Sequence, residues 1–191
     1  MSKRLTLVLG GVRAGKSRHA QTLAQTGQRV LVVATAEAGD AEMAARIQAH
    51  RAERPEHWDT LEEPLDPAAA LVPRLPDYDT VLLDCLTLWV SNLLLRPADE
   101  SQARPDISGE ADRLLKLYED GDASWIVVSN EVGLGVIPAN ELARAFADEL
   151  GRVNQIVAAA ADDVIVMYAG VPVNISTLAS ARMPGEGTGG R

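Results

Sequence analysis

The sequence has little cysteine, few basic residues and no long apolar run. Cys85 is the only cysteine, so no disulfide can form within the chain, and its apolar surroundings indicate a buried thiol in a reducing compartment. Eighteen lysines and arginines against 27 aspartates and glutamates give a net charge of -9, the wrong sign for a general binder of nucleic acid or anionic membranes. We therefore expect a cytoplasmic protein that binds no nucleic acid.

No apolar stretch approaches the ~20 residues that would span a bilayer. The run that begins at Leu5 resembles the start of a secretory signal, but it stops at Val12 and continues into Arg13 and Lys16 without a cleavage site. The overall composition is that of a globular protein, with 47% apolar and 24% charged residues. A chain of 191 residues is long enough to bury one substantial core.

Short apolar runs alternate with helical patterns along the chain. The runs are continuous, as in strands covered on both faces, and lie at residues 5–9, 30–34, 80–83, 125–128 and 164–168. One helix is predicted at 139–161, with an apolar face that consists of Leu142, Phe146, Leu150, Val153 and Val157. Another is predicted at 40–53, before Arg54-Pro55, and a shorter one begins with Asp66 as N-cap and Pro67. The alternation predicts a three-layer α/β fold with a mainly parallel sheet.

The chain shows no internal repeat and no boundary of a second domain. The polar segment 96–109 is expected to be a surface loop, because elements of the same alternation flank it. We expect a single domain over residues 1–182. Residues 183–191 contain four glycines and cannot bury apolar area, so we expect a disordered tail there.

A glycine-rich motif follows the first predicted strand and matches the complete phosphate-loop (P-loop) pattern G-x-x-x-x-G-K-[ST]. In such a loop the backbone N–H groups and the N-terminus of the next helix bind phosphate. The lysine reaches the β- and γ-phosphates, and the serine hydroxyl ligates Mg²⁺. The motif predicts a P-loop NTPase-like nucleotide site. Its residues are Gly10, Gly11, Val12, Arg13, Ala14, Gly15, Lys16 and Ser17. The Arg13 side chain could contact phosphate or solvent.

Asp84 ends the apolar run 80–83, at the sheet edge where ligand crevices form in open α/β folds. Its carboxylate suits Mg²⁺, held directly or through water together with Ser17. The alternative interpretation is an N-cap for the helix that follows.

Three classes of P-loop protein are considered. A regulatory GTPase requires D-x-x-G and N-K-x-D signatures, but Asp84 is followed by Cys-Leu-Thr and Asn130 by Glu-Val-Gly. The ATPase module of a larger assembly usually needs more chain for its partner surfaces. A small-molecule kinase or nucleotidyltransferase fits the chain length best.

A histidine lies among arginines in the predicted helix 40–53. Met43, Ile47 and His50 share one face, Arg46 lies one turn before His50, and Arg51 and Arg54 follow. An imidazole can attack an α-phosphate while guanidinium groups stabilise the charge on its oxygens. A surface helix with a solvated basic face would have the same spacing, and His19 and His57 are interpreted as structural.

Four blocks of sequence resemble the family of the bifunctional adenosylcobinamide kinase/adenosylcobinamide-phosphate guanylyltransferase of cobalamin biosynthesis. The blocks are Gly10 to Ala20, Met43 to Arg51 with Arg54-Pro and His57-Trp58, Ser129 to Gly133, and Gly151 to Gln155. They occur in the family's order, and the resemblance extends from about Leu5 to Ile175.

The resemblance implies two reactions. ATP or GTP phosphorylates adenosylcobinamide; GTP then transfers GMP to a histidine, and adenosylcobinamide phosphate accepts it to give adenosylcobinamide-GDP. The guanylylated histidine of the family corresponds to His50. The resemblance also implies a homotrimer. Outside the P-loop, the nucleotide contacts that it implies are Ala34, Thr35, Ala36, Arg51, Ala52, Glu53, Arg54, Glu62 and Asp84.

Two positions depart from the family pattern, and two strand-end residues are unassigned. Position 84 is aspartate where some relatives are expected to have glutamate, and Ala49 occupies a position where a second histidine can precede the nucleophile. Neither change removes the required chemistry. Asn130 and Glu131 follow the strand 125–128; Glu131 could serve as the base for the corrinoid hydroxyl or could stabilise its own turn.

Overall fold

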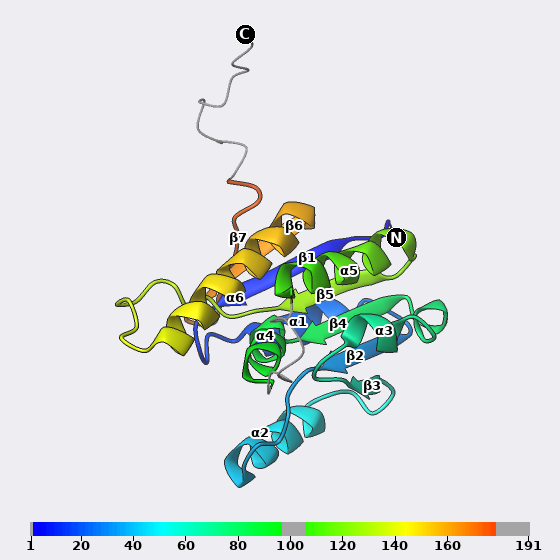
Figure 1. Cartoon of the computed structure of the whole chain (residues 1–191). Coiled ribbons are helices and arrows are strands. Elements are labelled where there is room, and N and C mark those ends of the chain that lie inside the picture. The colour runs from blue at the N-terminus through cyan, green and yellow to red at the C-terminus, as the bar shows by residue number, and fades with distance from the viewer. Residues whose placement is uncertain (1, 97–105, 179–191) are drawn as a thin grey trace.

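The computed structural model describes residues 2–96 and 106–178. Within these residues a seven-stranded sheet has the order β3-β2-β4-β5-β1-β6-β7 (Figure 1). Every neighbouring pair is parallel except β6 and β7, which are antiparallel. The strands are β1 Leu5–Gly10, β2 Val30–Ala34, β3 Asp59–Glu62, β4 Thr80–Asp84, β5 Ser124–Val128, β6 Asp163–Tyr168 and β7 Val171–Asn174. The α/β fold with a mainly parallel sheet is confirmed.

All five predicted strands are present, and two further strands were missed. Both missed strands lie at an edge of the sheet and have four residues each. β3 reads Asp-Thr-Leu-Glu and is only partly buried, while β7 contains Pro172 and is largely exposed. Neither has the continuous apolar run of a strand covered on both faces, so the sequence carries little signal for them.

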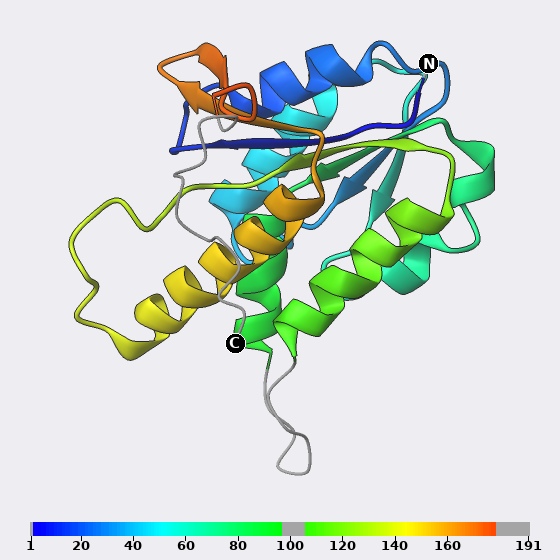
Figure 2. The same cartoon turned by 90° about the horizontal axis from the view of Figure 1, so that it is seen from above.

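The helices form two layers around the sheet (Figure 2). They are α1 Lys16–Ala24, α2 Ala41–Ala52, α3 Pro67–Leu71, α4 Leu86–Leu95, α5 Ile107–Asp120 and α6 Glu141–Ala160, with a short 3₁₀ turn at Leu75–Asp77. None of the described helices is long and apolar enough to cross a membrane.

The predicted helix starts are confirmed by their caps. The Asp40 carboxylate accepts a hydrogen bond from the Met43 N–H at 2.7 Å, and the Asp66 carboxylate accepts one from the Ala69 N–H at 3.0 Å. The loop prediction for 96–109 is wrong at its end, because α5 begins at Ile107. There the Asp106 side chain accepts a hydrogen bond from the Gly109 N–H. Residues 97–105 and the tail prediction for 183–191 lie outside the described residues.

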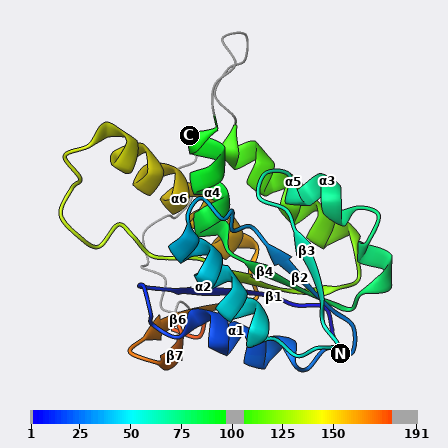
Figure 3. The ribbon, with the colours of Figure 1, turned by 90° about the horizontal axis from the view of Figure 1, so that it is seen from below.

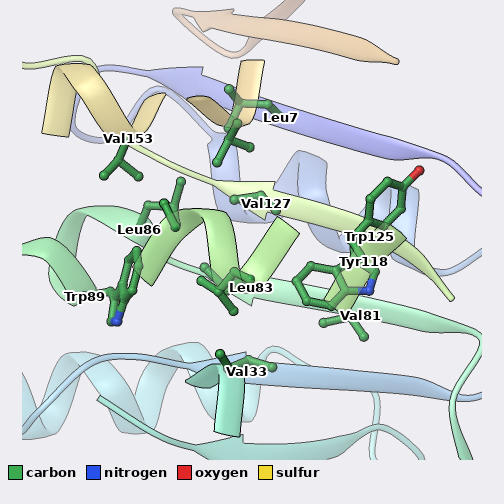
Figure 4. Packing of buried hydrophobic residues seen from close by; sticks show 14 of the residues in the cluster. Leu7, Val33, Val81, Leu83, Leu86, Trp89, Tyr118, Trp125, Val127 and Val153 are labelled. Atoms are coloured by element: carbon green, nitrogen blue, oxygen red, sulfur yellow. The ribbon is translucent and has the colours of Figure 1, made fainter. Parts of the chain in front are cut away.

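The core lies on both faces of the sheet. On one face β1, β4 and β5 pack against α3 to α6, with fully buried Trp89 and Val153 among the contacts (Figure 4). On the other face α1 packs Ala20 and Ala24 against Val8 and neighbouring strand residues. Because successive strand residues point to opposite faces, the strands read as unbroken apolar runs. Complete burial of each large apolar side chain contributes roughly 1.5–3 kcal/mol.

Only part of the predicted apolar face of α6 is buried. Leu150, Val153 and Val157 are buried, whereas Leu142 is 47% exposed. The N-terminal part of α6 projects beyond the sheet (Figure 2), and Phe146 is only partly buried against the core.

Candidate active site

The P-loop connects the inner strand β1 to α1, as the motif predicts. Gly10 and Gly15 have φ angles of 148° and 95°, which L side chains rarely adopt. A Cβ atom at Gly10 would lie 2.5 Å from the Met167 carbonyl oxygen. Glycine is therefore required at position 10 by backbone conformation and by the close approach of β6.

Hydrogen bonds to neighbouring strand ends hold the loop in place. The Glu131 N–H donates to the Gly10 carbonyl at 3.3 Å, and the Gly170 N–H donates to the Ala14 carbonyl at 3.1 Å. The Lys16 ammonium is buried and donates to the Gly11 carbonyl at 2.7 Å. The loop is thus wound around its own lysine, which donates to a carbonyl group of the loop.

A cavity of about 430 Å³ lies beside this loop, at the carboxyl ends of the parallel strands. The P-loop and the first turn of α1 form one wall, from Val12 to Arg18. The ends of β2 and β4 contribute Ala34, Ala36, Asp84 and Cys85, and α2 with the residues after it contributes Met43, Ile47, His50, Glu53 and Arg54. Figure 3 shows α1 and α2 on the same side of the sheet, which is why residues far apart in the sequence share this cavity.

His50 faces the same cavity as the P-loop. Met43, Ile47 and His50 all line it, so they share one helix face, while Arg51 on the same helix is exposed to solvent. The Nδ1 atom of His50 is buried and has no hydrogen-bond partner among the described residues.

Arg54 supplies positive charge near Asp84. Burial lowers the pKa of Arg54, while the nearby Asp84 carboxylate acts in the opposite direction. The Arg54 guanidinium also donates to the Thr60 hydroxyl at 3.3 Å. A guanidinium group stays protonated despite such a shift, so the cavity contains a cation suited to phosphate oxygens.

The cavity also contains the oxygen donors that Mg²⁺ prefers. Ser17 and Asp84 both line it. Asp84 does not cap the next helix, because the N-cap of α4 is Cys85, so the alternative interpretation of Asp84 is not observed. No group of three or more His, Cys, Asp or Glu residues suited to a metal occurs in the described part of the chain.

Several predicted nucleotide contacts, and the predicted catalytic residue Glu131, lie away from the cavity wall in this structure. Thr35 is fully buried, and its hydroxyl donates to the Cys85 carbonyl at 2.7 Å. Arg51 and Glu62 form an exposed ion pair at 3.1 Å. Glu131 is exposed and accepts a hydrogen bond from the Gly133 N–H at 2.8 Å. Gly10, Gly11 and Ala52 also lie outside the lining.

Other residues line the cavity although the sequence did not assign them to a site. They are Arg18, Cys85, Leu88, Val128 and Asn130. The Cys85 residue is partly exposed, although its thiol group is desolvated by burial, as the apolar run predicts. Asn130 was recognisable as a polar residue at a strand end, whereas Leu88 is an apolar helix residue without any local signal.

A wound glycine loop, a buried lysine and a cavity at the carboxyl ends of parallel strands define a P-loop nucleotide-binding protein. Residues 6–175 match the model of the family described as "Cobinamide kinase / cobinamide phosphate guanyltransferase". The chain belongs to this family of bifunctional enzymes, which confirms the resemblance found in the sequence.

Three curated relatives are similar over most of the chain. The "Bifunctional adenosylcobalamin biosynthesis protein CobP" of Pseudomonas aeruginosa is 47% identical over 87% of this chain and 94% of its own length. Proteins named "Bifunctional adenosylcobalamin biosynthesis protein CobU" from Salmonella typhimurium and Escherichia coli are 41% and 40% identical, each over 90% of this chain and 99% of its own length.

A solved structure of an ATPase from a bacterial type III secretion system is also similar to this chain. The TM-score is 0.47 and the sequence identity is 14%. The match covers 91% of this chain and 57% of that one.

Proposed function

We propose that this chain carries out two successive transfers at one cavity. It phosphorylates adenosylcobinamide with ATP or GTP, then moves GMP from GTP through a guanylyl-histidine at His50 to adenosylcobinamide phosphate. One observation carries this proposal: His50 lines the same cavity as Lys16 and Ser17 of the P-loop. The family membership gives the substrate class.

In the kinase step the aminopropanol hydroxyl oxygen of the corrinoid bonds to the γ-phosphorus. The bond from that phosphorus to the β,γ-bridging oxygen breaks, and a nucleoside diphosphate leaves. Lys16 and the backbone N–H groups of the loop bind the phosphates. Ser17 and Asp84 would hold Mg²⁺, which when bound neutralises phosphate charge. We assign the removal of the hydroxyl proton to Glu131, once its hydrogen bond to Gly133 is released.

In the guanylyl transfer an imidazole nitrogen of His50 bonds to the α-phosphorus of GTP, and pyrophosphate leaves. A phosphate oxygen of adenosylcobinamide phosphate then bonds to the same phosphorus, and the phosphorus–nitrogen bond breaks. The products are adenosylcobinamide-GDP and the free histidine. Arg54 lines the cavity and would stabilise negative charge on the α-phosphate oxygens.

The proposal also covers the other nucleotide contacts, the oligomeric state and the cellular location. Ala34, Thr35, Ala36, Arg51, Ala52, Glu53 and Glu62 are proposed to contact the nucleotide, as the family resemblance implies. We also propose a homotrimer and a cytoplasmic location, where ATP and GTP are available. Exposed apolar side chains support an assembly; those of Leu134, Val136 and Ile137 are 81% to 95% exposed.

The guanylyl-histidine is tested with GTP that carries its label at either the α- or the γ-phosphate. Label at the α-phosphate should remain on the protein, stable to base and released by acid, because the bond is a phosphoramidate. Label at the γ-phosphate should not remain, because it leaves with pyrophosphate. The His50→Ala variant should retain no label.

His57 provides a matched control, because it is an exposed histidine in the same segment outside the cavity lining. His57→Ala should label like the wild type. Full labelling of His50→Ala would contradict the assignment of the nucleophile. A protein that hydrolyses GTP without acting on adenosylcobinamide would contradict the proposed function as a whole.

A further inference from the structure

Asn130 lies between the end of β4, which carries Asp84, and the P-loop that follows β1. Strand β5 lies between β4 and β1 in the sheet, so the residues that follow it emerge between Asp84 and the P-loop. The register places Val128 opposite both Asp84 on β4 and Val8 on β1. Asn130 lies two residues beyond Val128 and lines the cavity.

The backbone of Asn130 is held by two buried side chains from different helices. The Asn130 N–H donates to the Thr87 hydroxyl of α4 at 2.8 Å, and the Asn154 amide of α6 donates to the Asn130 carbonyl at 3.1 Å. Thr87 and Asn154 are each 7% exposed. Burying polar groups costs free energy unless they form hydrogen bonds, and the buried Oδ1 of Asn154 has no partner among the described residues, so holding the two peptide units that flank Asn130 has a cost.

The chain on either side of Asn130 is anchored to the P-loop strand. The Ser129 N–H donates to the Val8 carbonyl at 3.0 Å, and the Glu131 N–H donates to the Gly10 carbonyl at 3.3 Å. From Glu131 to Ile137 every residue is exposed. These hydrogen bonds therefore fix the chain beside the cavity, at Asn130. They do not extend along the exposed loop that follows.

The carboxamide of Asn130 makes no hydrogen bond within the described part of the chain, although both of its backbone groups do. A carboxamide offers two N–H donors and an acceptor oxygen. It can therefore bind a phosphoryl oxygen and an attacking hydroxyl group at the same time. A side chain of this kind, held rigidly next to a phosphate loop, is suited to a reacting phosphoryl group.

We propose that Asn130 is a catalytic residue of the kinase step and that Thr87 and Asn154 position it. Its Nδ2 donates to an oxygen of the γ-phosphoryl group, and its Oδ1 accepts a hydrogen bond from the corrinoid hydroxyl. As that hydroxyl oxygen bonds to the γ-phosphorus, the bond to the β,γ-bridging oxygen breaks, and the hydroxyl proton leaves its hydrogen bond to Oδ1 for the Glu131 carboxylate, the base assigned above. This inference rests on the proposed function and deepens it.

The two transfers should depend on Asn130 to different degrees. In the kinase step charge develops on the γ-phosphoryl oxygens that Asn130 contacts. In the guanylyl transfer the reacting atom is the α-phosphorus, and the γ-phosphate is only part of the pyrophosphate that leaves. A contact to the γ-phosphate then contributes mainly to nucleotide binding, which affects KM more than kcat.

The experiment measures both transfers in Asn130→Ala. Transfer from γ-labelled ATP to adenosylcobinamide should lose about 10²–10³-fold in kcat, the usual effect of removing one donor to a transition-state oxygen. Labelling of the protein by α-labelled GTP should fall less than about tenfold in rate. Thermal melting monitored by circular dichroism establishes that the variant is folded.

Position 87 tests the anchoring separately. Thr87→Val removes the acceptor for the Asn130 N–H, so it should lower the kcat of the kinase step more than the rate of protein labelling. Thr87→Ser keeps the hydroxyl and should restore the kinase step. A merely structural role for Thr87 would lower both transfers together.

Equal losses in both transfers for Asn130→Ala would overturn the inference, as would an unchanged kinase rate. In either case a wild-type protein with both activities would leave the proposed function intact. A folded wild-type protein without kinase activity would instead overturn the proposed function, and this inference with it.

Discussion

Cys85 illustrates how single residues acquire their chemistry from the cavity. Burial, and after it the neighbouring Asp84 carboxylate, raises the pKa of the Cys85 thiol to about 11. The sequence indicated a buried thiol but not its place, because Cys85 follows an apolar strand whose end becomes a cavity wall only in the folded sheet. The thiol is therefore next to the proposed nucleotide site yet poorly reactive.

The raised pKa predicts slow alkylation of Cys85 in the folded protein. The thiolate is the reactive form, and it becomes populated only as the pH rises toward about 11. At pH 8 iodoacetamide should react on the order of 10²-fold more slowly than with the urea-unfolded chain, where the thiol has its ordinary pKa. Mass spectrometry measures this directly, since the chain has one cysteine.

Saturating GTP should slow the alkylation further, because Cys85 lines the cavity. Equal rates for the native and unfolded chains at pH 8 would show that the thiol is neither desolvated nor close to a carboxylate.

At the scale of elements, α2 is unusual among the helices. None of its residues with a described side chain is buried, whereas α1, α4, α5 and α6 each bury several. Helices derive most of their stability from tertiary packing, so α2 depends more than the others on its caps and on what fills the cavity. The sequence predicted its limits closely, because Asp40 and the Arg54-Pro55 pair are local signals.

Loss of the α2 cap should impair guanylylation without unfolding the protein. Asp40→Ala removes the hydrogen bond to the Met43 N–H and should destabilise the helix by about 1 kcal/mol. Hydrogen exchange of the α2 amides should become about fivefold faster. The rate of labelling by α-labelled GTP should fall, because His50 is positioned by this helix.

Asp106 provides the matched control, since it caps α5 with the same type of bond at 3.0 Å. The well-packed α5 belongs to the core, so Asp106→Ala should lower the melting temperature by about 2–4 °C and leave labelling unchanged. If Asp106→Ala lowers labelling as strongly as Asp40→Ala, the effect arises from general destabilisation.

At the scale of the whole molecule, the described surface includes apolar side chains in several places. Val171 and Val173 are exposed on the edge strand β7, and the segment from Leu134 to Ile137 is exposed before α6. Exposed apolar patches often mark contacts between protein chains. The sequence alone did not reveal this exposure, because apolar residues at 132–137 could equally have been part of a core.

The proposed homotrimer should have a mass of about three times the 20.4 kDa chain in sedimentation equilibrium. Because salt screens charges but does not weaken apolar contacts, 1 M NaCl should not dissociate it. A monomer mass at every protein concentration tested would contradict the proposed assembly.

Local sequence rules determined much of this protein. The inner strands, the caps of α2 and α3, and the P-loop with Lys16 and Ser17 could all be predicted, because each depends on residues that are neighbours along the chain. The edge strands β3 and β7 could not, since short and half-exposed strands carry almost no apolar pattern.

Only the tertiary structure determined which residues lie together at the cavity. The order of the sheet places Asn130 between Asp84 and the P-loop, and the crossover after β2 brings the His50 face of α2 to the same cavity. It also leaves Thr35 buried and Arg51 paired with Glu62, away from the cavity wall. Such placements depend on packing between distant segments, and no local pattern of residues encodes that packing.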